Sequence, residues 1–205
     1  MLELKQVAKH FGGLAALSDV SFSVNQGEIL GVIGPNGAGK TTLFNLITGV
    51  LSPTHGHVSY QDKSIVGLKP HTITKLGIAR TFQNIRLFGH ISALENVMVG
   101  THCRTQAGIW QALWRTAKQR KEERNTRAKA ESLLQLVGLE HSAAALAGAL
   151  PYGKQRRLEI ARALASDPGI VLLDEPTAGM NESETEDIRL LIAKIQSLGK
   201  AVVII

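Results

Sequence analysis

Gly34-Pro-Asn-Gly-Ala-Gly-Lys-Thr41 is the most informative segment of the chain. It matches the phosphate-binding pattern G-x-x-x-x-G-K-[ST] at every fixed position. An apolar run at residues 29–33 precedes it and residues 42–47 read as the start of a helix, which is the strand–loop–helix context of a working phosphate loop. Glycines let successive backbone N–H groups point at one anion, and the helix dipole adds positive potential. The stretch predicts a nucleoside triphosphate site.

Two side chains of this stretch have predicted roles. Lys40 would reach the β- and γ-phosphates, and the Thr41 hydroxyl would ligate Mg²⁺. The alternative is an ordinary glycine-rich turn. The match of the loop and of both its flanks favours the phosphate site.

A second motif follows residues 170–173, a short apolar run rich in branched residues that predicts a buried strand. It ends in Asp174 and Glu175. Ligands of open parallel sheets lie beyond the carboxyl ends of the strands, so both carboxylates would face the nucleotide. Asp174 would hold Mg²⁺, and Glu175 would accept a proton from the attacking water. Acidic pairs are also common on solvated surfaces, but the position after four apolar residues favours a catalytic pair.

Composition favours a soluble intracellular protein of one domain, with or without an inserted subdomain. No apolar run approaches the ~18 residues of a membrane span, and the first residues lack the layout of a secretory signal. Cys103 is the only cysteine, so no internal disulfide is expected and a reducing compartment is favoured. The aromatic content of 4% argues against a stacking platform for single-stranded nucleic acid.

The formal net charge is +6, and much of it lies in one stretch with helical spacing. Its basic residues are Arg115, Lys118, Arg120, Lys121, Arg124, Arg127 and Lys129. The stretch runs into apolar positions between residues 130 and 137, which predicts an amphipathic helix with a solvated charged face. Contact with a membrane surface or a nucleic acid is the less favoured alternative.

The order of elements predicts an α/β fold. Strands are expected at residues 2–7, 17–24, 29–33, 57–60, 170–173 and 201–205, and helices at residues 41–48, 155–166 and 182–198. Alternation of strands and helices around the phosphate loop predicts a parallel sheet, interrupted by a helical stretch at residues 91–148. Because Ile205 ends a buried-type strand, we expect a C-terminally truncated product.

Taken together, these motifs resemble the ATP-binding subunits of ABC transporters over essentially the whole chain. Gln83, in Ala79-Arg-Thr-Phe-Gln83, matches the Q-loop of that family. Residues 155–162 match the helix behind its signature, and residues 174–177 match its extended Walker B motif.

The resemblance implies a P-loop NTPase (RecA-like) core with a parallel sheet, an N-terminal antiparallel β subdomain and an inserted α-helical subdomain. Residues 1–205 would be a single ATP-binding domain. Residues 1–82 and 158–205 would form the core with the β subdomain, and residues 83–157 would form the helical subdomain.

A closer resemblance is to the branched-chain amino-acid importers, and within them to the G-type ATPase. It is carried by residues 79–88, 94–97 and 178–181. It implies an ATPase that powers uptake of branched-chain amino acids. Two alternatives stay open: a nucleotide-binding module too truncated to hydrolyse ATP alone, and the ATPase of another ABC system such as lipopolysaccharide export.

The resemblance also implies the site residues. Nucleotide contacts would come from Phe11, Gly34, Pro35, Asn36, Gly37, Ala38, Gly39, Lys40, Thr41, Thr42, Leu150, Pro151, Tyr152, Gly153 and Lys154. The catalytic residues would be Glu175, Lys40 and Gln83, and Mg²⁺ would be held by Thr41, Gln83 and Asp174. Phe11 would stack on adenine, although a strand core position is the alternative. Gln83 would sense the γ-phosphate, although a turn glutamine is the alternative.

Three departures from the family pattern matter. Leu150-Pro-Tyr-Gly-Lys154 stands where the signature reads Leu-Ser-Gly-Gly-Gln, so Pro151 removes a hydroxyl and an N–H. A lost charge-assisted hydrogen bond costs about 1.5–3 kcal/mol, which would weaken the site without abolishing it. Asn181 replaces the usual D-loop aspartate, and the switch histidine expected after the final strand is absent.

The resemblance implies partners as well. Two ATPase subunits, identical or different, would pair head to tail, with each ATP between the phosphate loop of one and residues 150–154 of the other. Integral membrane permeases would bind the helical subdomain, a substrate-binding protein would act indirectly, and no nucleic acid is expected. The chain would lie at the cytoplasmic face of the inner or plasma membrane.

Overall fold

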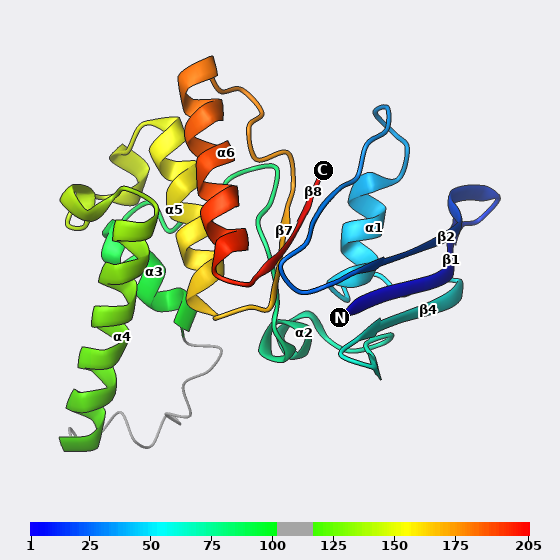
Figure 1. The fold of residues 1–205 in the computed structure, drawn as a ribbon, viewed down its shortest axis with the longest axis horizontal. Coiled ribbons are helices and arrows are strands. Elements are labelled where there is room, and N and C mark those ends of the chain that lie inside the picture. Colours follow the sequence, from blue (N-terminus) through cyan, green and yellow to red (C-terminus); the bar gives the residue numbers. More distant parts are fainter. Residues whose placement is uncertain (102–116) are drawn as a thin grey trace. The chain divides into compact units, whose positions relative to one another are not determined.

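The computed structural model describes residues 1–101 and 117–205, with side chains in the second range from residue 121 onward (Figure 1). The chain divides into two compact units. The first unit contains Met1–Gln83, Pro168–Ala178 and Ile192–Ile205, and the second contains Asn84–Asp167 and Gly179–Leu191. The prediction that residues 83–157 form a helical subdomain stays a prediction.

An antiparallel sheet of the first unit has the strand order β2-β1-β4-β5. Its strands are β1 (Leu2–Phe11), β2 (Leu14–Val24), β4 (His55–Tyr60) and β5 (Lys63–Ser64). Leu2 lies opposite Val24 on one side and opposite Tyr60 on the other, and all three side chains are buried. The predicted N-terminal antiparallel part is confirmed.

A parallel sheet of the same unit has the order β3-β8-β7-β6. Its strands are β3 (Ile29–Gly31), β8 (Ala201–Ile204), β7 (Ile170–Leu173) and β6 (Ile78–Arg80). Every residue of β7 is buried, as its uninterrupted apolar run predicts for an inner strand. The strand predicted at residues 29–33 is shorter than its apolar run: it ends at Gly31, and Ile33 is 97% exposed.

Helix α1 (Lys40–Ile47) follows the phosphate loop and anchors the first unit. Its Phe44 and Ile47 are fully buried in one cluster with Leu2 of the antiparallel sheet and Val203 of the parallel sheet. The α1 helix therefore joins both sheets through a common core. Deleting a buried phenylalanine side chain typically costs ~3–5 kcal/mol. Because packing of this strength holds α1 in the core, the loop at its start is attached to a rigid element.

Helices dominate the second unit. They are α3 (Ala93–Thr101), α4 (Ala117–Leu136), α5 (Tyr152–Ala165), the first part of α6 (Glu182–Ser197), and the short 3-10 turns Glu140–Ser142 and Ala147–Ala149. Gly100 lets α3 approach α5 closely, because a Cβ there would lie 2.3 Å from the carbonyl oxygen of Arg162. The helix predicted at residues 155–166 begins earlier, at Tyr152.

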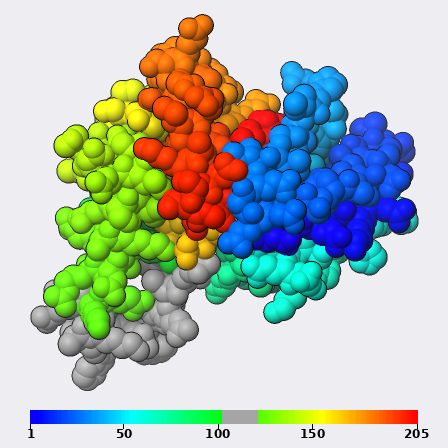
Figure 2. Space-filling model, viewed as in Figure 1, coloured from blue at the N-terminus to red at the C-terminus, as the bar shows by residue number. Residues whose placement is uncertain are grey.

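Helix α4 carries part of the predicted basic stretch and lies on the visible surface of the second unit (Figure 2). Ala130 and Leu134 are fully buried, whereas Lys121 and Arg124 are exposed, as an amphipathic helix requires. Arg127 donates a hydrogen bond to Glu131 one turn along the same face. The side chains of Lys118 and Arg120 are not described, and Cys103 and Arg115 lie outside the described residues.

Among the described residues, no helix combines the length and the apolar character that a membrane crossing needs.

Candidate functional site

The phosphate loop has the backbone shape that its glycines predict. Gly37 and Gly39 both have a φ of 82°, in the left-handed region that favours glycine. A Cβ at position 39 would lie 2.3 Å from the carbonyl oxygen of Ala16, so no other residue fits there. The first turn of α1, all of which is described, carries no acidic side chain, so the positive end of its dipole stays uncompensated. The loop is shaped and charged for an anion.

A cavity of about 570 Å³ opens over this loop in the first unit, within the ~300–1,000 Å³ typical of ligand pockets. It is lined by Phe11, Leu14, Ala15, Ala16, Asn36, Gly37, Gly39, Lys40, Thr41, Thr42, Gln83 and Glu175. The structure therefore brings together six of the predicted loop residues, the predicted adenine contact, the Q-loop glutamine and the predicted base, whereas Gly34, Pro35 and Ala38 are not among the lining residues. These residues come from segments far apart in the sequence, and they line one cavity.

Lys40 lies across the loop. Its Nζ donates hydrogen bonds to the carbonyl oxygens of Gly34 at 2.7 Å and Pro35 at 2.8 Å. The ammonium group is therefore held within the loop by neutral acceptors. Phosphate oxygens are stronger acceptors for a cation, so an entering polyphosphate is expected to take over these bonds.

Phe11 lies at the rim of the cavity, and its side chain is 46% exposed. Lys9 Nζ lies 5.1 Å from the centre of the Phe11 ring, an arrangement typical of a cation–π contact. This exposure argues against the alternative of a strand core residue.

Phe11→Ala provides a test of the predicted adenine contact. Stacking of a base on an aromatic ring is worth ~1–3 kcal/mol, so the substitution should weaken ATP binding about 5–150-fold. Phe11→Ala should leave the binding of inorganic triphosphate unchanged, because that ligand has no base. Calorimetric titration of both ligands makes the comparison, with Val66→Ala as the control, because Val66 is an exposed apolar residue outside the lining of the cavity. An equal loss for both ligands would contradict the assignment.

Glu175 has an unusual backbone. Its φ of 46° lies in the left-handed region, which a non-glycine residue occupies at a cost of ~1–3 kcal/mol. Its N–H donates to the carbonyl oxygen of Ile205 at 3.2 Å, and its Oε2 accepts a hydrogen bond from Gln83 Nε2 at 3.0 Å. The carboxylate is thus held at the cavity by a side chain that was itself predicted to belong to the site.

Asp174 is buried and is not among the residues that line this cavity. Its Oδ2 lies 2.8 Å from Arg80 Nη2, and the two side chains are 3% and 6% exposed. Its backbone N–H donates to Thr81 Oγ1 at 3.4 Å. Asp174 was predicted from the sequence as a site residue, whereas Arg80 was not. The only signal was a lone arginine within the short apolar strand that precedes Gln83.

The signature segment belongs to the second unit. Pro151 is the N-cap of α5, Leu150 is buried, and the Leu150 carbonyl oxygen accepts a hydrogen bond from Gln155 Nε2 at 2.7 Å. Tyr152 is 45% exposed, and its hydroxyl accepts a hydrogen bond from the buried Arg156 at 3.2 Å. The segment is therefore held by hydrogen bonds from side chains of α5, and it leads directly into the start of that helix.

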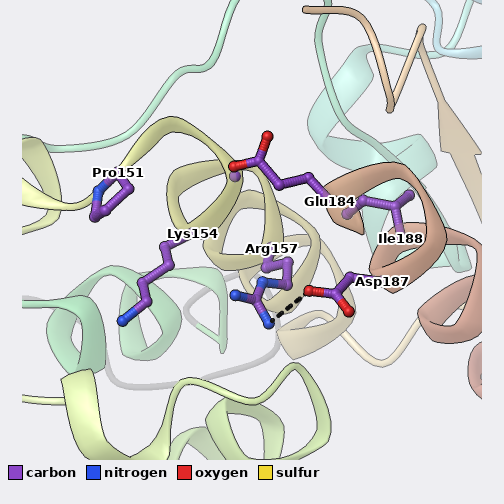
Figure 3. Close-up of a pocket in the computed structure, with 7 residues that line it drawn as sticks. Pro151, Lys154, Arg157, Glu184, Asp187 and Ile188 are labelled. Atoms are coloured by element: carbon purple, nitrogen blue, oxygen red, sulfur yellow. Dashed lines mark ion pairs between the residues drawn. The ribbon is translucent and has the colours of Figure 1, made fainter. Parts of the chain in front are cut away.

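A second cavity, of about 160 Å³, lies beside this segment. It is lined by Pro151, Gly153, Lys154, Arg157, Glu184, Asp187 and Ile188 (Figure 3). Its opposite charges are partly paired, with 3.8 Å between Arg157 and Asp187. A Cβ at Gly153 would lie 2.6 Å from Glu184 Oε1, so a larger residue there would require the Glu184 side chain to move.

Glu184 in turn forms a capping box with Asn181. The Asn181 side chain accepts a hydrogen bond from the Glu184 N–H at 2.9 Å, and the Glu184 carboxylate accepts one from the Asn181 N–H at 3.2 Å. The residue that departs from the D-loop pattern therefore also caps α6.

The ABC transporter family model matches residues 17–178 of the chain. Two ATP-binding proteins of high-affinity branched-chain amino acid transport are similar to it over 197 residues, which is 96% of this chain and 77% of each relative. BraF of Pseudomonas aeruginosa is 43% identical, and LivG of Escherichia coli (strain K12) is 39% identical. The lipopolysaccharide export system ATP-binding protein LptB of Escherichia coli (strain K12) is 34% identical over 203 residues, 99% of this chain and 78% of that relative.

Solved structures agree with these relatives. An ATP-binding cassette of an ABC transporter in its ADP conformation has a TM-score of 0.84 and 32% identity, over 99% of this chain and 79% of that one. A dimeric ATP-binding cassette in a post-hydrolysis state, bound to ADP and Pi, has a TM-score of 0.80 and 30% identity, over 100% of this chain and 87% of that one.

Proposed function

Because the chain belongs to the ABC transporter family of ATP-binding proteins, we propose that it hydrolyses ATP to power import of branched-chain amino acids through membrane permeases. The observation that carries the proposal is the cavity of the first unit, which joins the phosphate loop to Gln83 and Glu175. The substrate class follows the relatives named for branched-chain amino acid transport, which are 43% and 39% identical. The lipopolysaccharide export protein is less similar, at 34%.

The cavity suits ATP in both its parts. The amides and left-handed glycines of the loop suit the phosphates, and the exposed ring of Phe11, which lines the same cavity, suits the base. Leu150–Lys154 would contact the ATP of a second subunit rather than that of their own.

Mg²⁺ suits the proposed donors. A hydroxyl from Thr41, an amide oxygen from Gln83 and a carboxylate from Asp174 are hard oxygen ligands. Proteins commonly hold this ion by one or two carboxylates together with phosphates and water, and not by a cage of acidic side chains. When bound, the ion would neutralise phosphate charge.

The proposed chemistry uses positioned groups of the chain itself. Lys40 would leave the loop carbonyls for the phosphates and stabilise the charge that develops during transfer. Glu175 would take the proton of the attacking water at its carboxylate. Gln83, which donates to Glu175 Oε2, would orient that carboxylate.

We also propose a head-to-tail dimer with a second ATPase subunit, identical or different. A related cassette has been solved as a dimer bound to ADP and Pi. The N–H groups at the start of α5 would then face the partner's γ-phosphate. Permeases would hold the dimer at the cytoplasmic face of the membrane, and a substrate-binding protein would act through them.

Transport in proteoliposomes tests the substrate. The chain, its permeases, its second ATPase and its binding protein should take up labelled leucine with ATP inside the vesicles and not with ADP. Leucine uptake that is absent, or equal with ADP, would contradict the proposal.

The proline of the signature segment gives a second test. Pro151→Ser supplies a hydroxyl and an N–H at the N-cap of α5, so ATP hydrolysis by the assembled dimer should saturate at about tenfold lower ATP. Pro151→Ala, the matched control, restores only the N–H and should lower the KM for ATP by a smaller factor than Pro151→Ser. The steady-state KM for ATP is the measurement. An unchanged KM in both variants would contradict a phosphate contact at position 151.

A further inference from the structure

Arg80 contacts both Asp174, after β7, and helix α1, which begins at the phosphate loop; all three belong to the first unit. Arg80 is the last residue of β6 and lies opposite Leu172 of β7, two residues before Asp174. One guanidinium nitrogen, Nη2, donates to Asp174 Oδ2 at 2.8 Å. The other, Nη1, donates to Asn45 Oδ1 at 2.6 Å. A single planar cation therefore contacts both the carboxylate after β7 and the helix that begins at the phosphate loop.

Aromatic rings hold this cation in place. The guanidinium carbon lies 5.4 Å from the ring centre of Phe44 and 5.1 Å from that of Phe82. Phe44 belongs to the rigid α1 core and is fully buried, and the Arg80 side chain is only 6% exposed. Arginine suits this position because its planar group can stack on rings while its nitrogens form directed hydrogen bonds. The geometry fixes Arg80, and Arg80 in turn fixes Asp174.

Metal-binding carboxylates depend on partners of this kind. Hydrogen bonds from an outer shell orient the ligating group, and losing such a partner typically costs about 10–100-fold in metal affinity or activity. A carboxylate has two oxygens, and Arg80 occupies only Oδ2 of Asp174.

We propose that Arg80 is a positioning residue for Mg²⁺, which holds the Asp174 carboxylate in the orientation that serves the ion. The proposal rests on the proposed function, in which Asp174 belongs to the metal site. The role extends to Asn45, because the link to α1 sets the distance between Asp174 and the phosphate loop.

A purely structural ion pair would make a different prediction. Breaking a buried pair destabilises the fold because it leaves an uncompensated charge. That loss alone would not change how the folded protein responds to Mg²⁺. The Mg²⁺ dependence of nucleotide binding therefore separates the two roles.

The test uses binding of a fluorescent ADP to the whole chain at increasing Mg²⁺ concentrations, with no hydrolysis involved. In Arg80→Met, the Mg²⁺ concentration that gives half of the maximal gain in affinity should rise about 10–100-fold. ADP affinity in the presence of a chelator should stay at the wild-type value. Arg80→Lys should reverse only part of this rise in the Mg²⁺ midpoint, because an ammonium group cannot reach both Asn45 and Asp174 as a guanidinium does.

Two further variants complete the set. Arg189→Met removes an exposed arginine that pairs with Glu186 on α6, and it should leave the Mg²⁺ midpoint unchanged. Asp174→Asn should raise the midpoint at least as much as Arg80→Met. Should Asp174→Asn leave the midpoint unchanged, the metal role of Asp174 is wrong and the inference fails with it. Should Asp174→Asn shift the midpoint and folded Arg80→Met keep it or lower it, only the role of Arg80 is wrong.

Folding is checked by thermal unfolding of each variant. If Arg80→Met does not fold, Asn45→Ala takes its place, because it removes one anchor of Arg80 and leaves the pair with Asp174 intact. Asn45→Ala should raise the Mg²⁺ midpoint in the same direction by a smaller factor. An unchanged midpoint in that variant would overturn the proposal.

Discussion

Glu175→Gln is expected to lower the rate of ATP hydrolysis about 10²–10⁴-fold, the usual loss when a general base is removed. Nucleotide binding should persist. A glutamine has the same shape, and its amide oxygen can still accept the hydrogen bond that Gln83 donates to Glu175 Oε2. The variant should therefore hold ATP and accumulate as a closed dimer. Phosphate release by the assembled ATPase measures the rate, and gel filtration with ATP measures the dimer.

Glu123→Gln is the matched control, because Glu123 is an exposed carboxylate on α4 in the second unit. Its hydrolysis rate should equal that of the unmodified protein. An unchanged hydrolysis rate in Glu175→Gln would show that Glu175 is not the general base, even if the variant accumulates as a dimer.

Lys40→Ala has the next largest expected effect. Loss of one preorganised donor at a developing charge typically costs ~10²–10³-fold in rate. ATP binding should also weaken about 10–150-fold, as expected for a charge-assisted hydrogen bond of ~1.5–3 kcal/mol. The variant should still fold, because the hydrogen bonds that the structure shows for Lys40 Nζ are those to the carbonyl oxygens of Gly34 and Pro35.

Lys63→Ala tests whether any lost cation has this effect. Lys63 is exposed on β5, in the same unit and outside the lining of the cavity. Its ATP affinity, measured by calorimetry, should match the unmodified protein. Equal affinities for Lys40→Ala and Lys63→Ala would show that Lys40 does not contact the phosphates.

Local patterns in the sequence predicted most of the fold. The phosphate loop can be recognised from neighbouring residues alone, and the glycine at position 39 has the left-handed backbone that its motif implies. The run at β7 is apolar at every position because the strand lies between two others, and that run was sufficient to place Asp174 and Glu175 at its end. Such features depend on short stretches of chain, so sequence reasoning reached them.

Features that depend on distant contacts were not predicted. Strand β6 has three residues, too few for a period, and its pairing with β7 depends on tertiary structure. Arg80 and Asp174 are 94 positions apart, so no local pattern links them. The same applies to the close approach of Gly153 to the Glu184 carboxylate, which lies on another helix. The left-handed backbone of Glu175 has no signal in its residue type, which rarely adopts it.

Calorimetric titration of the Glu175→Gln chain with ATP in the presence of Mg²⁺ measures nucleotide binding without turnover. We expect saturable heat with one ATP bound per chain, and we expect this heat to be lost or strongly weakened in the double variant that also carries Lys40→Ala. No heat, or heat that Lys40→Ala leaves unchanged, would contradict the assignment of the nucleotide to the cavity over the phosphate loop.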